Sequence, residues 1–124
     1  DRLTAFPPRE LFFKEIPEGE PKFATYRAKW DDSYRERWGI DTGPAGGISQ
    51  DLEERIIETS KNAYRALGLR GYGRVDLRVK PDGEIYVIEV NPNPAIARDD
   101  DFMLGAAKVG LDYDAVIARI LNLA

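Results

Sequence analysis

Apolar side chains recur with periods that predict one long helix and a β-hairpin in the middle of the chain. Between 50 and 67 the spacing is helical, Ser49 can cap the first turn, and Gly68 can end the last one. Over 71–80 and 84–91, apolar and polar residues alternate on either side of a Pro-Asp-Gly turn, which predicts two antiparallel strands. The positions expected to face inward from the helix are Leu52, Ile56, Ala63 and Leu67.

Shorter patterns flank this central part. Helices are expected near 101–109 and 113–123. Alternation over 23–30 predicts a strand, and an apolar run at 11–13 between prolines predicts a short edge strand. The glycine-rich segment 31–49 predicts a long solvated loop, which we favour over a phosphate-binding loop because it lacks the Gly-Lys-Ser/Thr ending. The stripe expected on the last helix is Val116, Ile117, Ile120 and Leu121.

The predicted hairpin brings two carboxylates opposite each other. With a four-residue loop at 81–84, the apolar residues of both strands share one face, and a three-residue loop would destroy that agreement. The resulting pairs on the polar face are Arg74–Asn91, Asp76–Glu89 and Arg78–Val87. Asp76 and Glu89 would repel each other at this distance unless a cation or an arginine lay between them.

Two interpretations of this polar face are open. Asp76 and Glu89, together with the Asn91 amide oxygen, form the kind of oxygen donor set that magnesium prefers. Pro92 and Pro94 support this metal site by making the exit from the strand rigid. The alternative is a surface network of ion pairs, in which two neighbouring arginines of the first strand balance the acids.

The composition of the chain limits the kinds of site and partner that it can have. The 124 residues carry 18 Lys and Arg against 22 Asp and Glu, and this net charge of −4 argues against duplex nucleic acid as a partner. Cysteine and histidine are absent, which excludes disulfide scaffolds, imidazole metal sites and Ser-His nucleophiles. No apolar run approaches the about 20 residues that span a bilayer, so we expect a cytoplasmic protein with no membrane partner. Since the chain begins at Asp1, we also expect it to be a piece of a longer protein.

The motifs around the hairpin resemble the C-terminal half of ATP-grasp ligases, most closely the D-alanine–D-alanine ligase group. They are R-V-D at 74–76 and E-V-N-P-N-P at 89–94, preceded by G-L-R-G-Y-G. The resemblance extends to Y-R-A-K-W at 26–30 and to A-A-K-V-G-L-D-Y-D-A-V-I-A-R-I-L at 106–121. It implies an α+β fold in which residues 1–124 form a single C-terminal ATP-grasp subdomain, with an antiparallel β-sheet packed against helices.

The resemblance also implies roles for individual residues. Asp76 and Glu89 match the carboxylates that hold Mg²⁺ (or Mn²⁺), with Glu89 touching two ions, and Asn91 matches the amide that completes the ligand shell of the second ion. Arg74 matches an arginine placed against the acyl phosphate. In such ligases ATP phosphorylates a substrate carboxylate, and an amine then attacks the acyl phosphate. This chemistry needs electrostatics and positioning rather than a covalent side chain.

The resemblance assigns roles to two further residues and implies that another part of the enzyme lies outside this chain. Lys29 matches a lysine near the ATP phosphates, and Ile88 matches an apolar contact to adenine. The N-terminal remainder of the ATP-grasp domain supplies other phosphate ligands, so we expect the isolated chain to be inactive. Self-association into a homodimer is left open. The alternatives are a non-catalytic module that binds a ligand or partner, and a metal-dependent phosphohydrolase.

The segment after the motif departs from the ligases that join two D-alanines. Those enzymes have glycine and then Ser-Leu at this point, whereas this chain has Ala95 followed by I-A-R-D-D-D-F. We therefore expect a different carboxylate or amine substrate. For the acidic run 99–101 we favour a solvated helix start over a site for a cationic substrate. Arg98 is open between a substrate carboxylate and those acids.

Overall fold

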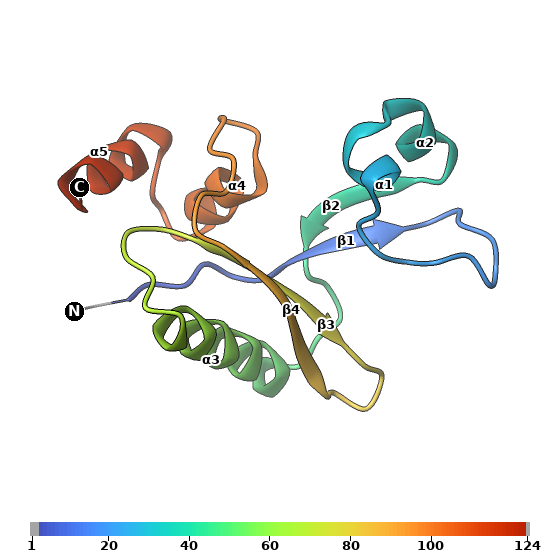
Figure 1. Cartoon of the computed structure of the whole chain (residues 1–124), viewed down its shortest axis with the longest axis horizontal. Helices are drawn as coiled ribbons and strands as arrows, with labels where there is room; N and C mark the ends of the chain where they lie inside the picture. The colour runs from blue at the N-terminus through green and yellow to red at the C-terminus, as the bar shows by residue number, and fades with distance from the viewer. Residues whose placement is uncertain (1–2, 124) are drawn as a thin grey trace. The chain divides into compact units, whose positions relative to one another are not determined.

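A computed structural model describes residues 3–123 as an α+β chain that divides into two compact units (Figure 1). The smaller unit comprises Arg9–Gly46, and the larger one joins the described residues up to Pro8 with those from Gly47 onward. Each unit contains a two-stranded antiparallel sheet, which confirms the α+β expectation. Among residues 3–123, no helix combines the length and the apolar character that a membrane crossing requires. That residues 1–124 form one subdomain stays a prediction.

The smaller unit is built on the pairing of β1, Arg9–Phe13, with β2, Ile40–Pro44. β1 confirms the short strand expected around 11–13. The long loop expected over 31–49 is wrong, because this segment holds β2 and also α2, Asp32–Arg37. The sequence of β2 is I-D-T-G-P, which carries no strand period, and its strand conformation depends on backbone pairing with β1.

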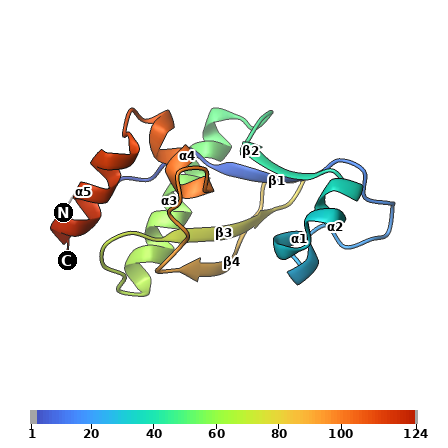
Figure 2. The same ribbon diagram turned by 90° about the horizontal axis from the view of Figure 1, so that it is seen from above.

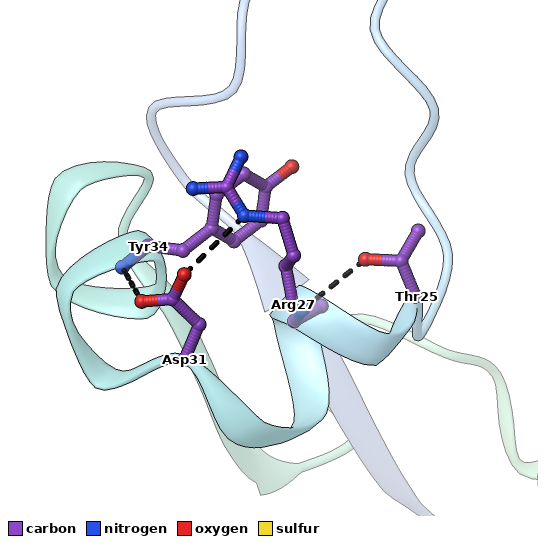
Figure 3. Close-up of polar contacts among 5 residues, drawn as sticks. Thr25, Arg27, Asp31 and Tyr34 are labelled. Carbon is purple, nitrogen blue, oxygen red and sulfur yellow. Dashed lines mark hydrogen bonds and ion pairs between the residues drawn. The ribbon is translucent and has the colours of Figure 1, made fainter.

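The strand expected over 23–30 is also wrong, because this segment contains the helix α1, Tyr26–Trp30. The Thr25 hydroxyl accepts a hydrogen bond from the Ala28 N–H at 3.1 Å, and this caps α1 (Figure 3). Asp31 then ends α1 and caps α2 by accepting the Tyr34 N–H at 2.9 Å. Alternation over eight residues is compatible with a short helix as well as a strand, and here the two caps favour the helix.

The larger unit begins with α3, Gln50–Ala66, as the sequence predicts. Ser49 Oγ accepts the Leu52 N–H at 3.2 Å, and Gly68 has a φ of 63°, so both predicted ends are confirmed. Ile56 is buried and α3 packs against the following hairpin, which Figure 2 shows from above. Leu67 is 63% exposed, so its inward placement is wrong: it lies at the C-cap, where the helical stripe no longer sets its direction.

The hairpin consists of β3, Arg74–Val79, and β4, Ile85–Asn91. Its loop has three residues rather than four, because the Lys80 N–H donates to the Glu84 carbonyl at 2.9 Å and the Gly83 N–H donates to the Lys80 carbonyl at 2.9 Å. Gly83 has a φ of 85°, as three-residue hairpin loops require. The predicted four-residue loop is therefore wrong.

A β-bulge at Ile88 restores the predicted pairing beyond it. The ladder shifts between Asp76 and Leu77, which leaves Ile88 without a partner residue on β3. The pairs Arg74–Asn91 and Asp76–Glu89 are as predicted, whereas the predicted Arg78–Val87 pair is wrong. The pairs nearer the loop are Leu77–Val87, Arg78–Tyr86 and Val79–Ile85. Ile85 and Val87 thus take the places on the apolar face that the prediction assigned to Tyr86 and Ile88.

The C-terminal helices α4, Asp101–Lys108, and α5, Tyr113–Leu123, form a second layer of the larger unit. α5 packs against α4, and their shared core is Met103, Ala106 and Val116. Leu121 is 71% exposed and does not belong to this core, so its predicted inward position is wrong. The other three residues of the predicted stripe pack in or against the core.

The acidic run before α4 begins the helix, as we favoured. Asp100 is the N-cap residue and accepts the Ala97 N–H at 2.5 Å. The contacts of Arg98 are with residues of α5, and a substrate carboxylate as its partner stays a prediction. The Arg98 guanidinium lies over the Tyr113 ring at 4.1 Å and 3.7 Å from an Asp114 carboxylate oxygen.

Candidate functional site

Four of the six predicted site residues lie together on the polar face of the hairpin. β3 contributes Arg74 and Asp76, and β4 contributes Glu89 and Asn91. Because the pairs Arg74–Asn91 and Asp76–Glu89 are two positions apart in the ladder, their side chains leave the sheet on the same face. The bulge at Ile88 makes this possible: if Ile88 paired with Asp76 in a regular ladder, the three-residue loop would place Glu89 on the opposite face.

Arg74 and Asp76 form the strongest electrostatic interaction on this face. Arg74 Nε donates to Asp76 Oδ1 at 2.7 Å, and Arg74 Nη2 donates to Asp76 Oδ2 at 2.9 Å. These hydrogen bonds and the charge of Asp76, with smaller contributions from Glu89 and Asp101, raise the pKa of the Arg74 guanidinium. Both side chains are about one-third exposed, at 39% and 34%. This bidentate pair is one of the ion pairs that the predicted network requires.

Asn91 is held by residues that the sequence analysis did not single out. Its Oδ1 accepts the Asn93 N–H at 2.8 Å, which closes a tight turn over the first proline of the motif. The Tyr72 hydroxyl in turn donates to Asn93 Oδ1 at 2.6 Å, and the Tyr72 ring lies 5.5 Å from that of Phe102 on α4. The repeated Asn-Pro in E-V-N-P-N-P was the available signal for a second positioned amide.

The donor set on this face fits a hard divalent cation. Two carboxylates, Asp76 and Glu89, oppose each other across the strands, with the Asn91 amide beside them. Within residues 3–123 the Glu89 carboxylate is engaged in no hydrogen bond or ion pair, so its oxygens are available as ligands. The described part of the chain holds no group of three or more acidic side chains arranged for a metal. Magnesium commonly uses one or two protein carboxylates together with phosphate and water oxygens.

The other two predicted site residues are Ile88 and Lys29. Ile88 is the bulged residue of β4 and is 67% exposed, which leaves an apolar side chain open to a ligand next to Glu89. Lys29 is exposed on α1 of the smaller unit and thus does not belong to the hairpin face. The roles assigned to all six residues stay predictions.

Two surface hollows of the smaller unit are lined by none of the predicted site residues. A groove of about 540 Å³ lies within the smaller unit, where Arg27 stacks on the Tyr34 ring at 4.5 Å and Arg37 on the Trp38 ring at 4.8 Å. None of the predicted site residues lines it. We give the hairpin face more weight than this groove, because the hairpin carries the opposed carboxylates.

Comparison with known proteins identifies one group of relatives. Residues 7–122 match the family described as D-ala D-ala ligase C-terminus. A D-alanine–D-alanine ligase of Haemophilus influenzae (strain PittEE) is 32% identical over 108 residues, which are 87% of this chain and 34% of that protein. The chain therefore spans about a third of the length of this curated relative.

Similar solved structures are also D-alanine–D-alanine ligases. A crystal structure of D-alanine–D-alanine ligase from Bacillus anthracis covers 95% of this chain, with a TM-score of 0.71 and 27% identity, and 34% of that chain is matched. A structure of the Bacillus anthracis ligase complexed with ATP covers 64% of this chain, with a TM-score of 0.60 and 31% identity, and 28% of that chain is matched. The fold expected from the sequence is thereby confirmed.

Proposed function

Because the chain belongs to the family of D-alanine–D-alanine ligase C-terminal domains, we propose that it is the nucleotide- and metal-binding C-terminal part of an ATP-dependent ligase. The ligase would join a small-molecule carboxylate to an amine. The observation that carries the proposal is the polar face of the β3–β4 hairpin, where Asp76 and Glu89 oppose each other beside Arg74 and Asn91. A structural relative complexed with ATP supports the choice of nucleotide.

Three residues would hold the divalent cations. Asp76 and Glu89 would supply carboxylate oxygens from neighbouring strands, Asn91 would supply its amide oxygen, and Glu89 would contact both ions. When bound, Mg²⁺ or Mn²⁺ would neutralise charge on the ATP phosphates. The turn at Asn93 restricts the Asn91 side chain, which lowers the conformational entropy lost when a ligand binds.

The remaining predicted residues would position the reactants. Arg74 offers N–H donors to the oxygens of a phosphate leaving group, and a guanidinium binds such oxygens through two parallel hydrogen bonds. Lys29 would contact the ATP phosphates as a point charge, and the exposed Ile88 would pack against adenine. These side chains bind and orient the reactants without forming a covalent bond to them, in keeping with a chain that lacks cysteine and histidine.

The reaction consists of two transfers. A substrate carboxylate oxygen takes the γ-phosphoryl group of ATP, which gives an acyl phosphate and ADP. An amine nitrogen then attacks the acyl carbon, an amide bond forms, and inorganic phosphate leaves while the amine loses a proton. Because Ala95 and the following segment depart from the enzymes that join two D-alanines, we propose a different carboxylate or amine.

The parent protein would complete this site. The chain spans 34% of a curated relative, so we propose that the preceding part of the parent supplies the rest of the ATP-grasp domain. On this proposal the isolated chain has no turnover, and the parent works in the cytoplasm, where ATP is available.

A phosphate-release assay on the full-length parent tests the proposal. With ATP, Mg²⁺ and a panel of amino acids and other carboxylates, phosphate release should require both an acid and an amine. Glu89→Gln should lower the rate by more than about 100-fold, because an amide is a poorer ligand for these cations. Glu84→Gln is the matched control: it changes a glutamate of the same hairpin that pairs with Lys80, and it should leave the rate unchanged.

Each outcome separates the proposal from its alternatives. Phosphate release without an amine acceptor would identify a phosphohydrolase instead. No nucleotide-dependent signal with any substrate would identify a binding module. A melting temperature of Glu89→Gln at or slightly above that of the wild type is expected, because the substitution removes a cross-strand repulsion.

A further inference from the structure

We propose that Arg74 and a divalent cation compete for the carboxylate of Asp76, so that metal binding frees the Arg74 guanidinium to bind an anion. The inference rests on the proposed function and adds an order of events to it: the cation binds first, and the phosphate-binding arginine becomes available as a consequence. The geometry that points to this is the bidentate pair in which Arg74 engages both oxygens of Asp76, at 2.7 and 2.9 Å.

The competition follows from where the charges lie. Arg74 and Asp76 are two residues apart on β3, so their side chains leave the same face of the strand. A cation coordinated by Asp76 would lie a few ångströms from the guanidinium, where two positive charges repel strongly at a partly desolvated site. The bidentate pair occupies one lone pair on each oxygen of the carboxylate, so a cation bound to the remaining lone pairs would lie beside the guanidinium.

The Arg74 side chain is partly exposed to solvent. Its exposed fraction is 39%, so the guanidinium has room to move when its bonds to Asp76 are lost. Glu89, directly opposite Asp76, has no hydrogen bond or ion pair within the described residues and gives the incoming cation a first ligand. The cation thus gains a second carboxylate as Arg74 leaves Asp76.

The displaced arginine gains donors for a phosphate. While it is paired with Asp76, Arg74 commits its Nε and Nη2 donors, which form one edge of the guanidinium. That edge is the one a phosphate or carboxylate binds bidentately. Metal binding would therefore convert Arg74 from a counter-ion of the protein into a free anion-binding group on the same face.

Binding of Mn²⁺ alone to the 124-residue chain tests the inference, with electron paramagnetic resonance measuring free Mn²⁺. Arg74→Met should tighten Mn²⁺ binding about tenfold, because the competing pair is lost. Arg74→Lys, which keeps the charge and loses the bidentate geometry, should tighten it about threefold. Arg78→Met is the matched control for charge, since Arg78 is also two residues from Asp76, and it should change the affinity less than Arg74→Met.

Nuclear magnetic resonance of the Arg74 side chain tests the inference in the wild-type chain, so the result does not depend on whether a variant folds. Addition of Mg²⁺ to the wild-type chain should shift the Arg74 Nε–H signal and speed its exchange with water. If that signal is unchanged at saturating Mg²⁺, the inference is overturned. Equal Mn²⁺ affinities in Arg74→Met and Arg78→Met would also overturn it, because ordinary charge screening would then explain the effect.

Failure of this inference can be distinguished from failure of the proposed function. If Glu89→Gln weakens Mn²⁺ binding while the Arg74 variants bind like the wild type, the metal site stands and the competition is rejected. If Glu89→Gln leaves Mn²⁺ binding unchanged, or no binding occurs, the metal site itself is rejected and the competition with it.

Discussion

The Asp31 side chain stabilises the junction of two helices in the smaller unit. Its carboxylate accepts the Tyr34 N–H at 2.9 Å and lies 3.3 Å from Arg27 Nε, at the junction of α1 and α2 (Figure 3). The Tyr34 N–H bond is the main cause that lowers the pKa of Asp31, and the bond and charge of Arg27 add to it while partial desolvation opposes both. The charged form of Asp31 therefore favours the capped conformation.

The lowered pKa of Asp31 predicts a pH dependence of this cap. Since the folded-state pKa lies below the unfolded value of about 3.9, the stabilisation is present above about pH 4 and is lost as the pH falls through the folded-state pKa. In an NMR titration, the Tyr34 amide proton should shift with a midpoint below 3.9. Asp31→Asn should abolish that titration, whereas Asp32→Asn, at the next position, should retain it. A Tyr34 titration unchanged in Asp31→Asn would contradict the assignment.

The hairpin shows how two local features compensate each other at the scale of an element. A three-residue loop alone would reverse the face of every residue of β4 relative to a four-residue loop. The bulge at Ile88 reverses the faces again, so Glu89 and Asn91 return to the face of Asp76. Hydrophobic matching predicted the site pairs correctly but assigned the wrong apolar residues near the loop.

Deletion of Ile88 tests this compensation. Removing the bulged residue should give a regular ladder in which Val87 still pairs with Leu77 and Glu89 still pairs with Asp76. Cross-strand nuclear Overhauser contacts between residues 76 and 89 should therefore persist. Ile88→Ala, which keeps the chain length, should retain both the bulge and these contacts. Loss of the 76–89 contacts in the deletion variant would show that the bulge does not set the register.

At the scale of the whole molecule, the core of the larger unit joins residues from both ends of the chain. The Phe6 ring meets the Phe102 ring at a centroid distance of 5.2 Å, edge to face. It also lies over Gly105, where an added Cβ would come within 3.3 Å of Phe6. Phe6 packs against the buried cluster of α4 and α5, so an N-terminal segment closes the C-terminal layer.

Phe6→Ala measures the contribution of that contact. Loss of a half-buried aromatic ring should lower the free energy of unfolding by about 2 kcal/mol, less than for a fully buried phenylalanine. Phe23→Ala is the matched control: Phe23 is 58% exposed, and its replacement should change the unfolding free energy by less than about 0.5 kcal/mol. Urea denaturation measures both values. Equal effects of the two substitutions would remove Phe6 from the core.

In the candidate site, some features follow from the sequence and others depend on the tertiary structure. Hydrophobic matching of two alternating strands predicted that Asp76, Glu89 and Asn91 share a face, but the bulge that brings them there was not predicted. That Arg74 engages both oxygens of Asp76 depends on side-chain conformations that the spacing leaves open. The positioning of Asn91 by Asn93 depends on a turn that also could not be derived from alternation.

The sequence by itself determined the helices α3, α4 and α5, the strand β1, and the position of the hairpin turn, because caps, glycine stops and apolar periodicity act over a few neighbouring residues. Only the tertiary structure decided that β2 is a strand, that the loop has three residues with a compensating bulge, and that α5 packs on α4. These features depend on which distant backbone and side chains supply partners, and that choice minimises the free energy of the whole packed chain rather than of any one segment.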